Sequence, residues 1–407
     1  MIKRVFLFLT FLFSCLAAFS QNSYLGRMDL SKGPKSFEVN NDESKVPSFT
    51  LPDPLIMNNG KRVRSAGQWV KQRRGEILEI FSSEMYGPIP PSPDGLHFKV
   101  LDVKETELDG LATQKTVRIF LDRSEQHWFD MMLLLPNSRK GRTPVFAGLN
   151  FCYDNEETFK EKKGEAWPFE MILQAGFGVA TAVRHDIEPE WKEYKGPKRE
   201  GLSSWYAPDC RAISAWAWGL SRIMDYLETD SDVDARKVAV IGHSRLGKTA
   251  LWAAANDQRF SLVISNCSGA CGAAISRRRL GERFSVCGGI FPYWFCDRFQ
   301  TWGEREDEFP ADQHWLAALI APRPLYIASA TDDLWADPRG EWLTAASVGP
   351  VYRLFGKKGL SETEMPSPDC PDNNGTVAYH IHTGRHMICR YNWEQYIAFA
   401  RRQFKMK

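Results

Sequence analysis

The chain has 407 residues, of which 43% are hydrophobic and 25% are charged, a composition that is ordinary for a globular protein. Its 52 basic and 50 acidic residues leave a formal net charge of +2, so the charge balance gives no indication of a nucleic-acid partner. The length alone would allow two or three domains, but α/β folds of this size often form one unit.

Residues 1–20 have the features of a secretory signal peptide. Lys3-Arg4 supplies the positive charge, and the apolar run Val5–Ala18 is too short to span a bilayer comfortably. Ala18-Phe19-Ser20 then gives a small-x-small cleavage pattern. A lipoprotein anchor at Cys15 is the alternative, which the residues before it fit less well. We therefore expect a secreted or periplasmic protein without a membrane span.

Eight cysteines remain after this leader, and an exported protein can pair them in disulfides. The even number allows full pairing but does not require it, and Cys267 and Cys271 are also compatible with two buried free thiols. No matched pair of C-x-x-C motifs is present, so we expect no zinc or other metal site. The eight are Cys152, Cys210, Cys267, Cys271, Cys287, Cys296, Cys370 and Cys389.

The next segments predict an arm, a helix and a group of strands. Residues 21–65 are rich in Pro, Asn, Ser and Lys and predict an extended arm on a catalytic domain that covers residues 66–407. Apolar residues at helical spacing over 68–85 predict a helix, which Gly87-Pro88 ends. Three strands are then expected, of which the first two are half-buried and antiparallel: 98–101, 116–120 and 131–135.

From residue 144 onward, short apolar strands alternate with helices. This alternation predicts a mostly parallel central sheet covered on both faces, which is a three-layer α/β sandwich. The expected strands are 144–149, 178–183, 238–241, 262–265, 324–328 and 377–381. The clearest helices are 212–227 and 391–404.

The most specific motif is Gly242-His243-Ser244-Arg245-Leu246-Gly247-Lys248, between an apolar strand and a helix that begins near Leu246. In α/β-hydrolases this context forms the nucleophile elbow, a strained turn that presents a serine above the sheet edge. The N-terminus of the following helix offers N–H groups to a developing oxyanion. The second glycine comes one position later than in G-x-S-x-G, and a serine that only caps a helix is the competing interpretation. Ser244 is the candidate nucleophile.

A serine nucleophile requires a base, and in this fold the base follows the nucleophile and the acid in the chain. His386 lies between the last predicted strand and the last predicted helix, which is where the fold places its base. Three other histidines follow Ser244 and are expected to be structural: His314, His380 and His382.

The acid that orients the base should follow the strand that ends near residue 330. Asp332 and Asp333 both lie in that loop. Asp333 is favoured by its offset from the strand end, although a loop aspartate is more often a turn former or a helix cap.

Taken together, these motifs resemble carbohydrate esterase family 15, the glucuronoyl esterases, from about residue 60 to the C-terminus. The elbow is similar to that family's Gly-x-Ser-Arg-x-Gly-Lys. Four further segments resemble motifs of the family and occur in the same order: 215–227, 312–314, 321–324 and 335–338. The resemblance implies an α/β-hydrolase that hydrolyses esters of 4-O-methyl-glucuronic acid, such as those that join glucuronoxylan to lignin. No cofactor is implied, and we expect a monomer.

The resemblance also implies roles for individual side chains. Ser244 would attack the uronoyl carbonyl, His386 would be the base, and Arg245 would help to hold the oxyanion through charge-assisted hydrogen bonds. Three further side chains would contact the sugar through hydrogen bonds or a ring face: Lys248, Glu282 and Trp335. Without the resemblance, the two charged ones would be interpreted as solvated surface groups.

One departure from the family concerns the acid. Many members carry it as Glu in an Asn-x-Ser-Gly segment, and here Cys267 takes that position within Asn266-Cys267-Ser268-Gly269. A thiol cannot stabilise an imidazolium as a carboxylate does, so we infer that Asp333 is the acid. His243 stands where fungal relatives have a disulfide cysteine, so that bridge is absent.

Two other functions stay open at this point. One is an acetyl xylan esterase or another carbohydrate esterase on the same fold, against which Arg245 and Lys248 argue because acetyl groups need no uronate contacts. The other is an inactive sugar-binding module. This alternative is suggested by Cys267, which stands where many members of the family have the catalytic glutamate.

Overall fold

The computed structural model describes residues 39–151, 166–189 and 200–406, and the residues from Val39 onward form one compact unit. The predicted signal peptide, the first part of the predicted arm and Cys152 lie outside the described residues. The boundary between arm and catalytic domain at residue 65 also stays a prediction. Within the described ranges, no helix is both long and apolar enough to cross a membrane.

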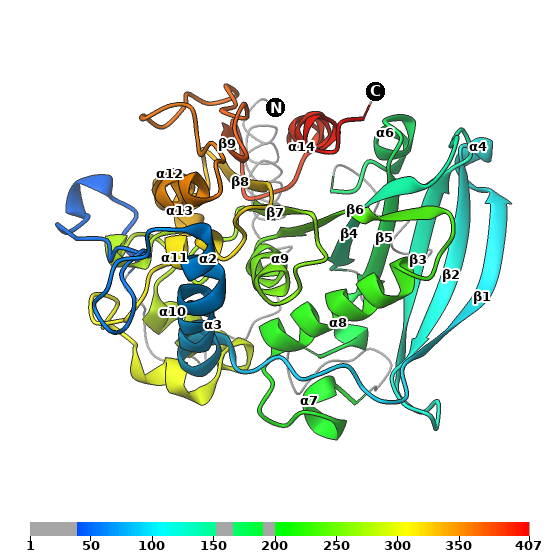
Figure 1. Cartoon of the computed structure of the whole chain (residues 1–407), viewed down its shortest axis with the longest axis horizontal. Helices are drawn as coiled ribbons and strands as arrows, with labels where there is room; N and C mark the ends of the chain where they lie inside the picture. The colour runs from blue at the N-terminus through cyan, green and yellow to red at the C-terminus, as the bar shows by residue number, and fades with distance from the viewer. Residues whose placement is uncertain (1–38, 152–165, 190–199, 407) are drawn as a thin grey trace, which may run out of the picture. The chain divides into compact units, whose positions relative to one another are not determined.

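A nine-stranded sheet organises this unit in the order β1-β2-β3-β5-β4-β6-β7-β8-β9 (Figure 1). The pairs from β1 through β3 to β5 are antiparallel, and every pair from β5 to β9 is parallel. The predicted mostly parallel sheet is confirmed. The strands are β1 (His97–Thr106), β2 (Ala112–Phe120), β3 (Trp128–Pro136), β4 (Thr143–Asn150), β5 (Gly178–Val183), β6 (Val233–His243), β7 (Leu262–Asn266), β8 (Leu325–Ala330) and β9 (Val377–His382).

Strand β1 departs from its prediction. We expected a half-buried strand over 98–101, but β1 is more than twice as long and is exposed beyond its first two residues. Val100 and Val103 are 44% and 48% exposed. β1 is the edge strand and lies beyond the end of α8 (Ala212–Leu227; Figure 1). Phe98 near its start packs against Tyr226 of α8, with ring centroids 5.5 Å apart, whereas Val100 and Val103 lie past the helix and stay exposed.

Helices cover both faces of the sheet, as predicted. α6 (Phe169–Gln174) and α14 (Arg390–Gln403) lie on one face, while α8 (Ala212–Leu227) and α9 (Arg245–Asn256) lie on the other (Figure 1). α12 (Pro338–Ser347) lies on the same face of the sheet as α8 and α9. Neighbouring residues of a strand point to opposite faces: Ser329 of β8 donates to Glu341 of α12, whereas Ala328 belongs to the core beneath α14. The other α-helices within the described residues are α2 (Ala66–Gln68), α3 (Arg74–Phe81), α4 (Glu107–Gly110), α7 (Leu202–Trp205), α10 (Phe284–Ile290), α11 (Gln313–Ala318) and α13 (Gly349–Leu354).

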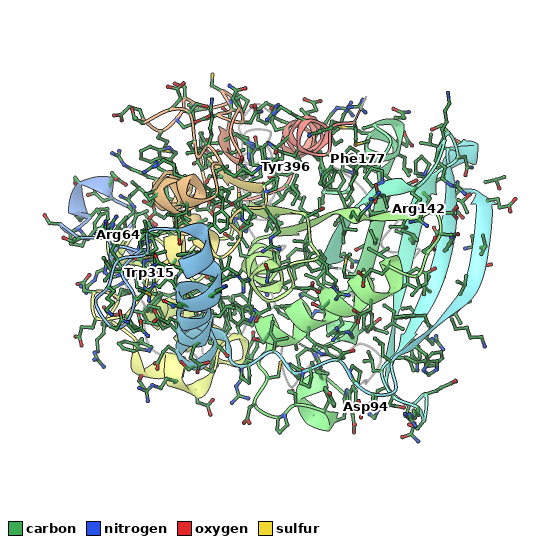
Figure 2. All side chains as sticks on the ribbon, in the orientation of Figure 1. Arg64, Asp94, Arg142, Phe177, Trp315 and Tyr396 are labelled. Atoms are coloured by element: carbon green, nitrogen blue, oxygen red, sulfur yellow. The ribbon has the colours of Figure 1, made fainter. Side chains whose placement is uncertain are left out.

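Aromatic rings fill the space between the sheet and α14. The ring of Phe146 in β4 lies 4.7 Å from that of Phe177 and 5.2 Å from that of Trp393. Phe177 and Tyr396 lie on this side of the sheet (Figure 2). Each such side chain contributes about 1.5–3 kcal/mol when it leaves water. This packing anchors α14 and therefore one end of the loop that carries His386.

The strand order changes direction at β4 and β6, whose carboxyl ends form a topological switch point. The chain leaves β4 for β5 on one side and then returns through α8 to β6 on the other side of β4. Ligands of α/β proteins bind at such a topological switch point. Phe151 follows β4 there, and Ser244 follows β6.

The turn after β6 has the strain that a nucleophile elbow requires. Ser244 has φ 57° and ψ −128°, a conformation that costs a residue other than glycine about 1–3 kcal/mol. A Cβ on Gly242 would lie 1.8 Å from the carbonyl oxygen of Leu246, and one on Gly247 would lie 2.9 Å from Ser268 Cβ. Both glycines therefore allow the close approach of the turn, including the one that comes a position late.

We predict that Gly242→Ala destabilises the protein by about 3 kcal/mol or more, because the methyl group overlaps a backbone oxygen that cannot move aside. Gly75→Ala in α3 is the matched control, since nothing lies within 4 Å of its new Cβ. A helical alanine there should raise the stability by about 0.5–1 kcal/mol. Denaturant unfolding of both variants measures the two changes, and equal effects would contradict the elbow geometry.

Candidate active site

Asp333 and His386 are joined by a direct hydrogen bond. Nδ1 of His386 and the Asp333 carboxylate are 2.5 Å apart, and the ring must be the donor because an ionised carboxylate only accepts. The side chain of Asp333 is 3% exposed and that of His386 is 37% exposed. The buried carboxylate thus steadies one ring nitrogen, and the other nitrogen points away from it.

Backbone hydrogen bonds hold the loop after β8 against the loop after β9. They determine which of the neighbouring aspartates, Asp332 or Asp333, faces His386. The N–H of Thr331 donates to the His382 carbonyl at 2.9 Å, and that of Asp332 donates to the Gly384 carbonyl at 2.8 Å. The carboxylate of Asp332 is exposed and accepts from the Thr331 hydroxyl at 3.0 Å. Asp333 is therefore the aspartate of this loop that bonds to the His386 ring.

The His386 ring also lies beside the nucleophile elbow. Its centroid is 4.6 Å from that of His243, the residue directly before Ser244. Burial, reinforced by His386, holds the pKa of His243 well below its usual value. The His386 ring thus lies against the turn that carries Ser244, with the neutral ring of His243 packed on the candidate base.

The other candidate histidines are held inside the protein. His380 and His382 lie in β9, and the side-chain amide of Asn392 donates to both rings, at 2.8 and 3.1 Å. Burial lowers the pKa of His380 to about 3. His314 is also buried and bonds through Nε2 to the Pro52 carbonyl at 2.9 Å.

Cys267 is a buried thiol next to the Asp333–His386 pair. Burial, together with the charges of Asp333 and Glu341, raises the pKa of Cys267 well above its usual value. A neutral thiol can donate a weak hydrogen bond to Asp333 but carries no negative charge to offer His386. Like Cys267, the other described cysteines are free thiols: Cys210, Cys271, Cys287, Cys296, Cys370 and Cys389.

Three side chains at this site could together hold a metal ion, because their ligand atoms lie within 4.8 Å of one another: Cys267, Asp333 and His386. Nitrogen and oxygen ligands of a tetrahedral zinc ion lie about 3.3 Å apart, given bonds of about 2.0–2.2 Å. The 2.5 Å contact between His386 and Asp333 is too short for that and fits a hydrogen bond. A metal on Nδ1 would also leave the proton on Nε2, so the ring could not act as a base.

Arg245, the first residue of α9, brings a cation to the elbow. Its guanidinium lies 4.5 Å from the ring centroid of Trp294, which stacks on Phe291 at 3.8 Å. Burial and the charges of Arg184 and Arg245 lower the pKa of His185 to about 2. The Arg245 guanidinium and the N-terminus of α9 favour negative charge beside Ser244.

Lys248 is fully engaged inside the protein. Its Nζ donates to the carbonyls of Ser268 and Ala270, each at 2.7 Å, and to the Glu282 carboxylate at 2.8 Å. The side chains of Lys248 and Glu282 are 3% and 6% exposed. The three N–H groups of the ammonium are therefore used, and Lys248 anchors the backbone after β7. Its contact with a sugar stays a prediction.

Trp335 lies next to this ion pair and is 40% exposed. Its carbonyl accepts from the N–H of Glu282 at 2.8 Å. Gly281 has φ 64°, and a Cβ there would lie 2.3 Å from the Trp335 carbonyl oxygen. The close approach fixes the backbone of Trp335 beside that of Glu282, and its partly exposed ring is the candidate surface for stacking on a sugar.

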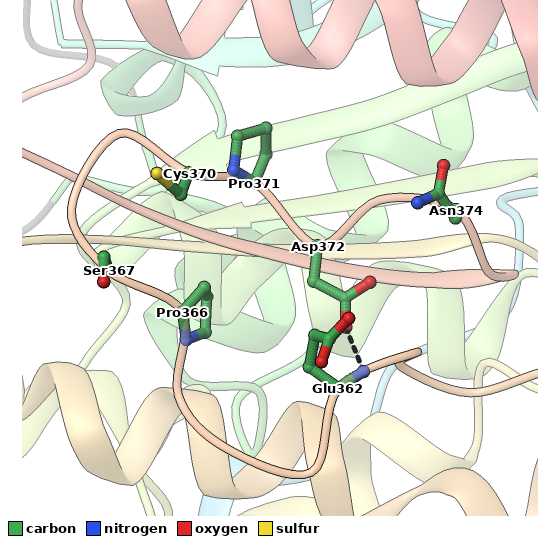
Figure 3. A pocket seen from close by; sticks show the side chains of 7 residues that line it. All are labelled: Glu362, Pro366, Ser367, Cys370, Pro371, Asp372 and Asn374. Atoms are coloured by element: carbon green, nitrogen blue, oxygen red, sulfur yellow. Dashed lines mark hydrogen bonds between the residues drawn. The ribbon is translucent and has the colours of Figure 1, made fainter.

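A hollow of about 390 Å³ lies in the segment between α13 and β9 (Figure 3). It is lined by Glu362, Pro366, Ser367, Cys370, Pro371, Asp372 and Asn374. The Asp372 carboxylate is occupied there, since it accepts from the N–H groups of Ser361 and Glu362. None of the predicted site residues lines this hollow.

Sequence reasoning missed two groups that shape the site. Glu341 is buried in α12, which raises its pKa to about 8, and it accepts from the N–H groups of Ser268 and Gly269 at 2.6 and 3.0 Å. Asn266 bonds to both the elbow and the His386 loop. The sequence does point to Asn266, because it lies in the Asn-x-Ser-Gly segment. Nothing in the sequence distinguishes Glu341 from a solvent-exposed glutamate on a helix.

A serine in a strained strand–turn–helix elbow, on a mostly parallel sheet with helices on both faces, defines the α/β-hydrolase class. A family model described as fungal glucuronyl esterase matches residues 196–356. A carbohydrate esterase from an unknown prokaryotic organism is 42% identical over 91% of this chain and 93% of its own length. A 4-O-methyl-glucuronoyl methylesterase from Phanerochaete carnosa is 27% identical over 84% of this chain and 77% of its own length.

Solved structures agree with these matches. A promiscuous esterase of carbohydrate esterase family 15 from the marine bacterial metagenome superposes with a TM-score of 0.83 at 40% identity, covering 90% of this chain and 100% of its own. A glucuronoyl esterase from Solibacter usitatus gives 0.81 at 41% identity, covering 89% and 100%. The chain belongs to carbohydrate esterase family 15 and is a carboxylic ester hydrolase of the glucuronoyl esterase type.

We predict that Asp333→Asn lowers kcat by about 10⁴-fold, because the amide favours the wrong tautomer of His386 while the geometry is kept. Asp332→Asn is the matched control and should change kcat by less than about threefold. Cys267→Ala should lower it by less than about tenfold, since the thiol carries no charge. Steady-state kinetics on one ester compares the three. A larger loss in Cys267→Ala than in Asp333→Asn would show that the acid is misassigned.

Proposed function

We propose that this esterase cleaves esters of 4-O-methyl-glucuronic acid through an acyl-enzyme, with Ser244, His386 and Asp333 as its triad. The observation that carries the proposal is the bond between buried Asp333 and His386, whose ring packs on the residue before Ser244. A triad needs this combination of an exposed alcohol, a base and an orienting acid.

In the first half of the reaction, Ser244 Oγ attacks the uronoyl carbonyl carbon while Nε2 of His386 takes its proton. The backbone N–H groups at the start of α9 and the Arg245 guanidinium stabilise the oxyanion that forms. When the intermediate collapses, the bond to the alcohol oxygen breaks and His386 returns the proton to that oxygen. Water then attacks the acyl-enzyme by the same path and releases the uronic acid.

A uronate substrate is favoured by the groups around the elbow. Trp335 offers a partly exposed ring for stacking on a sugar, and its backbone carbonyl accepts from the backbone N–H of Glu282. Relatives named as glucuronoyl esterases and 4-O-methyl-glucuronoyl methylesterases support the same substrate class. The natural substrate in this proposal is the ester link between glucuronoxylan and lignin. Such a polymer is met outside the cell, in keeping with export by the predicted signal peptide.

A broader ester range is the second candidate, because one relative at 40% identity is described as promiscuous. Hydrolysis of acetylated xylan at a higher kcat/KM than that of glucuronate esters would favour it.

We predict that the wild type hydrolyses methyl and benzyl glucuronate and that Ser244→Ala lowers the rate by about 10⁶-fold, as loss of a triad nucleophile does. Release of glucuronic acid is measured for both proteins, with acetylated xylan as the comparison substrate. A fluorophosphonate should label the wild type at Ser244. Full turnover by Ser244→Ala would refute the nucleophile, and the absence of any labelling would favour a sugar-binding module.

A further inference from the structure

Asn266, the last residue of β7, connects the two loops that carry the proposed nucleophile and base. Ser244 follows β6 and His386 follows β9, so β7 and β8 separate the two strands in the sheet. Asn266 is completely buried and therefore acts through other residues. Whatever holds the two loops in register must bridge this gap.

The backbone of Asn266 holds the elbow. Its carbonyl accepts from the N–H of Ser244 at 2.9 Å, and Asn266 pairs with His243 in the parallel ladder between β6 and β7. The strained serine is thus tied through its own amide to the end of the neighbouring strand.

The side chain of Asn266 reaches the loop of His386. Its Nδ2 donates to Nδ1 of His243 at 2.8 Å and to the carbonyl of Met387 at 3.0 Å. Oδ1 accepts from the hydroxyl of Tyr396 in α14 at 2.6 Å. Because the carbonyl of Met387 can only accept, it fixes which way the amide faces.

This orientation also fixes the state of His243. Since Nδ1 accepts a hydrogen bond from the amide, the ring proton lies on Nε2 and the ring is neutral. That neutral ring packs against His386 at 4.6 Å. One amide group therefore contacts the residue before the nucleophile and the residue after the base.

We propose that Asn266 is a positioning residue that sets the distance and angle between Ser244 and His386. The proposal rests on the proposed catalytic roles of those two residues. Misplacement of reacting groups by about 1 Å can cost 10²-fold in rate, so loss of the two amide bonds should reduce the chemical step while substrate contacts stay in place.

The test uses Asn266→Asp, which keeps the shape and the acceptor for Tyr396 but has no N–H to donate. We expect kcat on methyl glucuronate to fall about 10²-fold with KM changed by less than about threefold. The rate of Ser244 labelling by a fluorophosphonate should fall by a similar factor, because labelling needs the same alignment. Tyr396→Phe is the matched control: it removes the bond to Oδ1, leaves both amide donors, and should change kcat by less than about threefold.

His243→Phe is the second variant, for the case in which Asn266→Asp does not fold. It keeps a ring against His386 but has no acceptor for Nδ2, and kcat and labelling should fall together by about tenfold. Unchanged labelling in the folded variants, or a change confined to KM, would overturn the proposal. Wild-type protein that is labelled but inactive on glucuronate esters would refute the substrate and leave the positioning role standing. Wild-type protein that is not labelled would refute the nucleophile itself.

Discussion

The site depends on one partly buried hydrogen bond, in which the buried carboxylate of Asp333 holds the Nδ1–H of the more exposed His386. A carboxylate that is 3% exposed interacts with a developing imidazolium more strongly than one in water, because little solvent screens it. The same bond sets the tautomer, so that Nε2 is left to accept a proton. The loop pairing between residues 331–332 and 382–384 makes this contact a property of the fold and not of two flexible side chains.

The sheet brings these groups together by ending its parallel strands at one edge. The elbow follows β6, Asn266 ends β7, the acid follows β8 and the base follows β9. Helices on opposite faces then fix the strand ends: α14 through the aromatic core, and α12 through Glu341. Cys267 carries no negative charge to offer His386, and the loop after the neighbouring strand β8 supplies that ring with a carboxylate.

Much of the fold followed from the sequence because buried parallel strands are uniformly apolar. β5 and α8 were predicted with the bounds that they have, and β4, β7, β8 and β9 to within a residue or two. β6 was predicted too short because its first half contains charged residues such as Asp234 and Arg236, and β1 was predicted half-buried because a local pattern does not reveal which strand lies at the edge.

The site was predicted unevenly for a similar reason. Ser244 lies in a local motif, and the choice of Asp333 over Asp332 agrees with the contact that is found. The burial of Lys248 could not be predicted, because its acceptors at Ser268, Ala270 and Glu282 are 20 or more residues away in the chain. The contacts of the Asn266 side chain with His243 and Met387 likewise become visible only in the folded chain.

The Asp333–His386 bond is tested most directly by the proton NMR spectrum of the resting enzyme at low field, where a strongly hydrogen-bonded imidazole N–H resonates. We predict a resonance from His386 Nδ1–H that disappears in Asp333→Ala and in His386→Ala but persists in Cys267→Ala. A resonance that survives removal of Asp333, or that is lost with Cys267 alone, would contradict it.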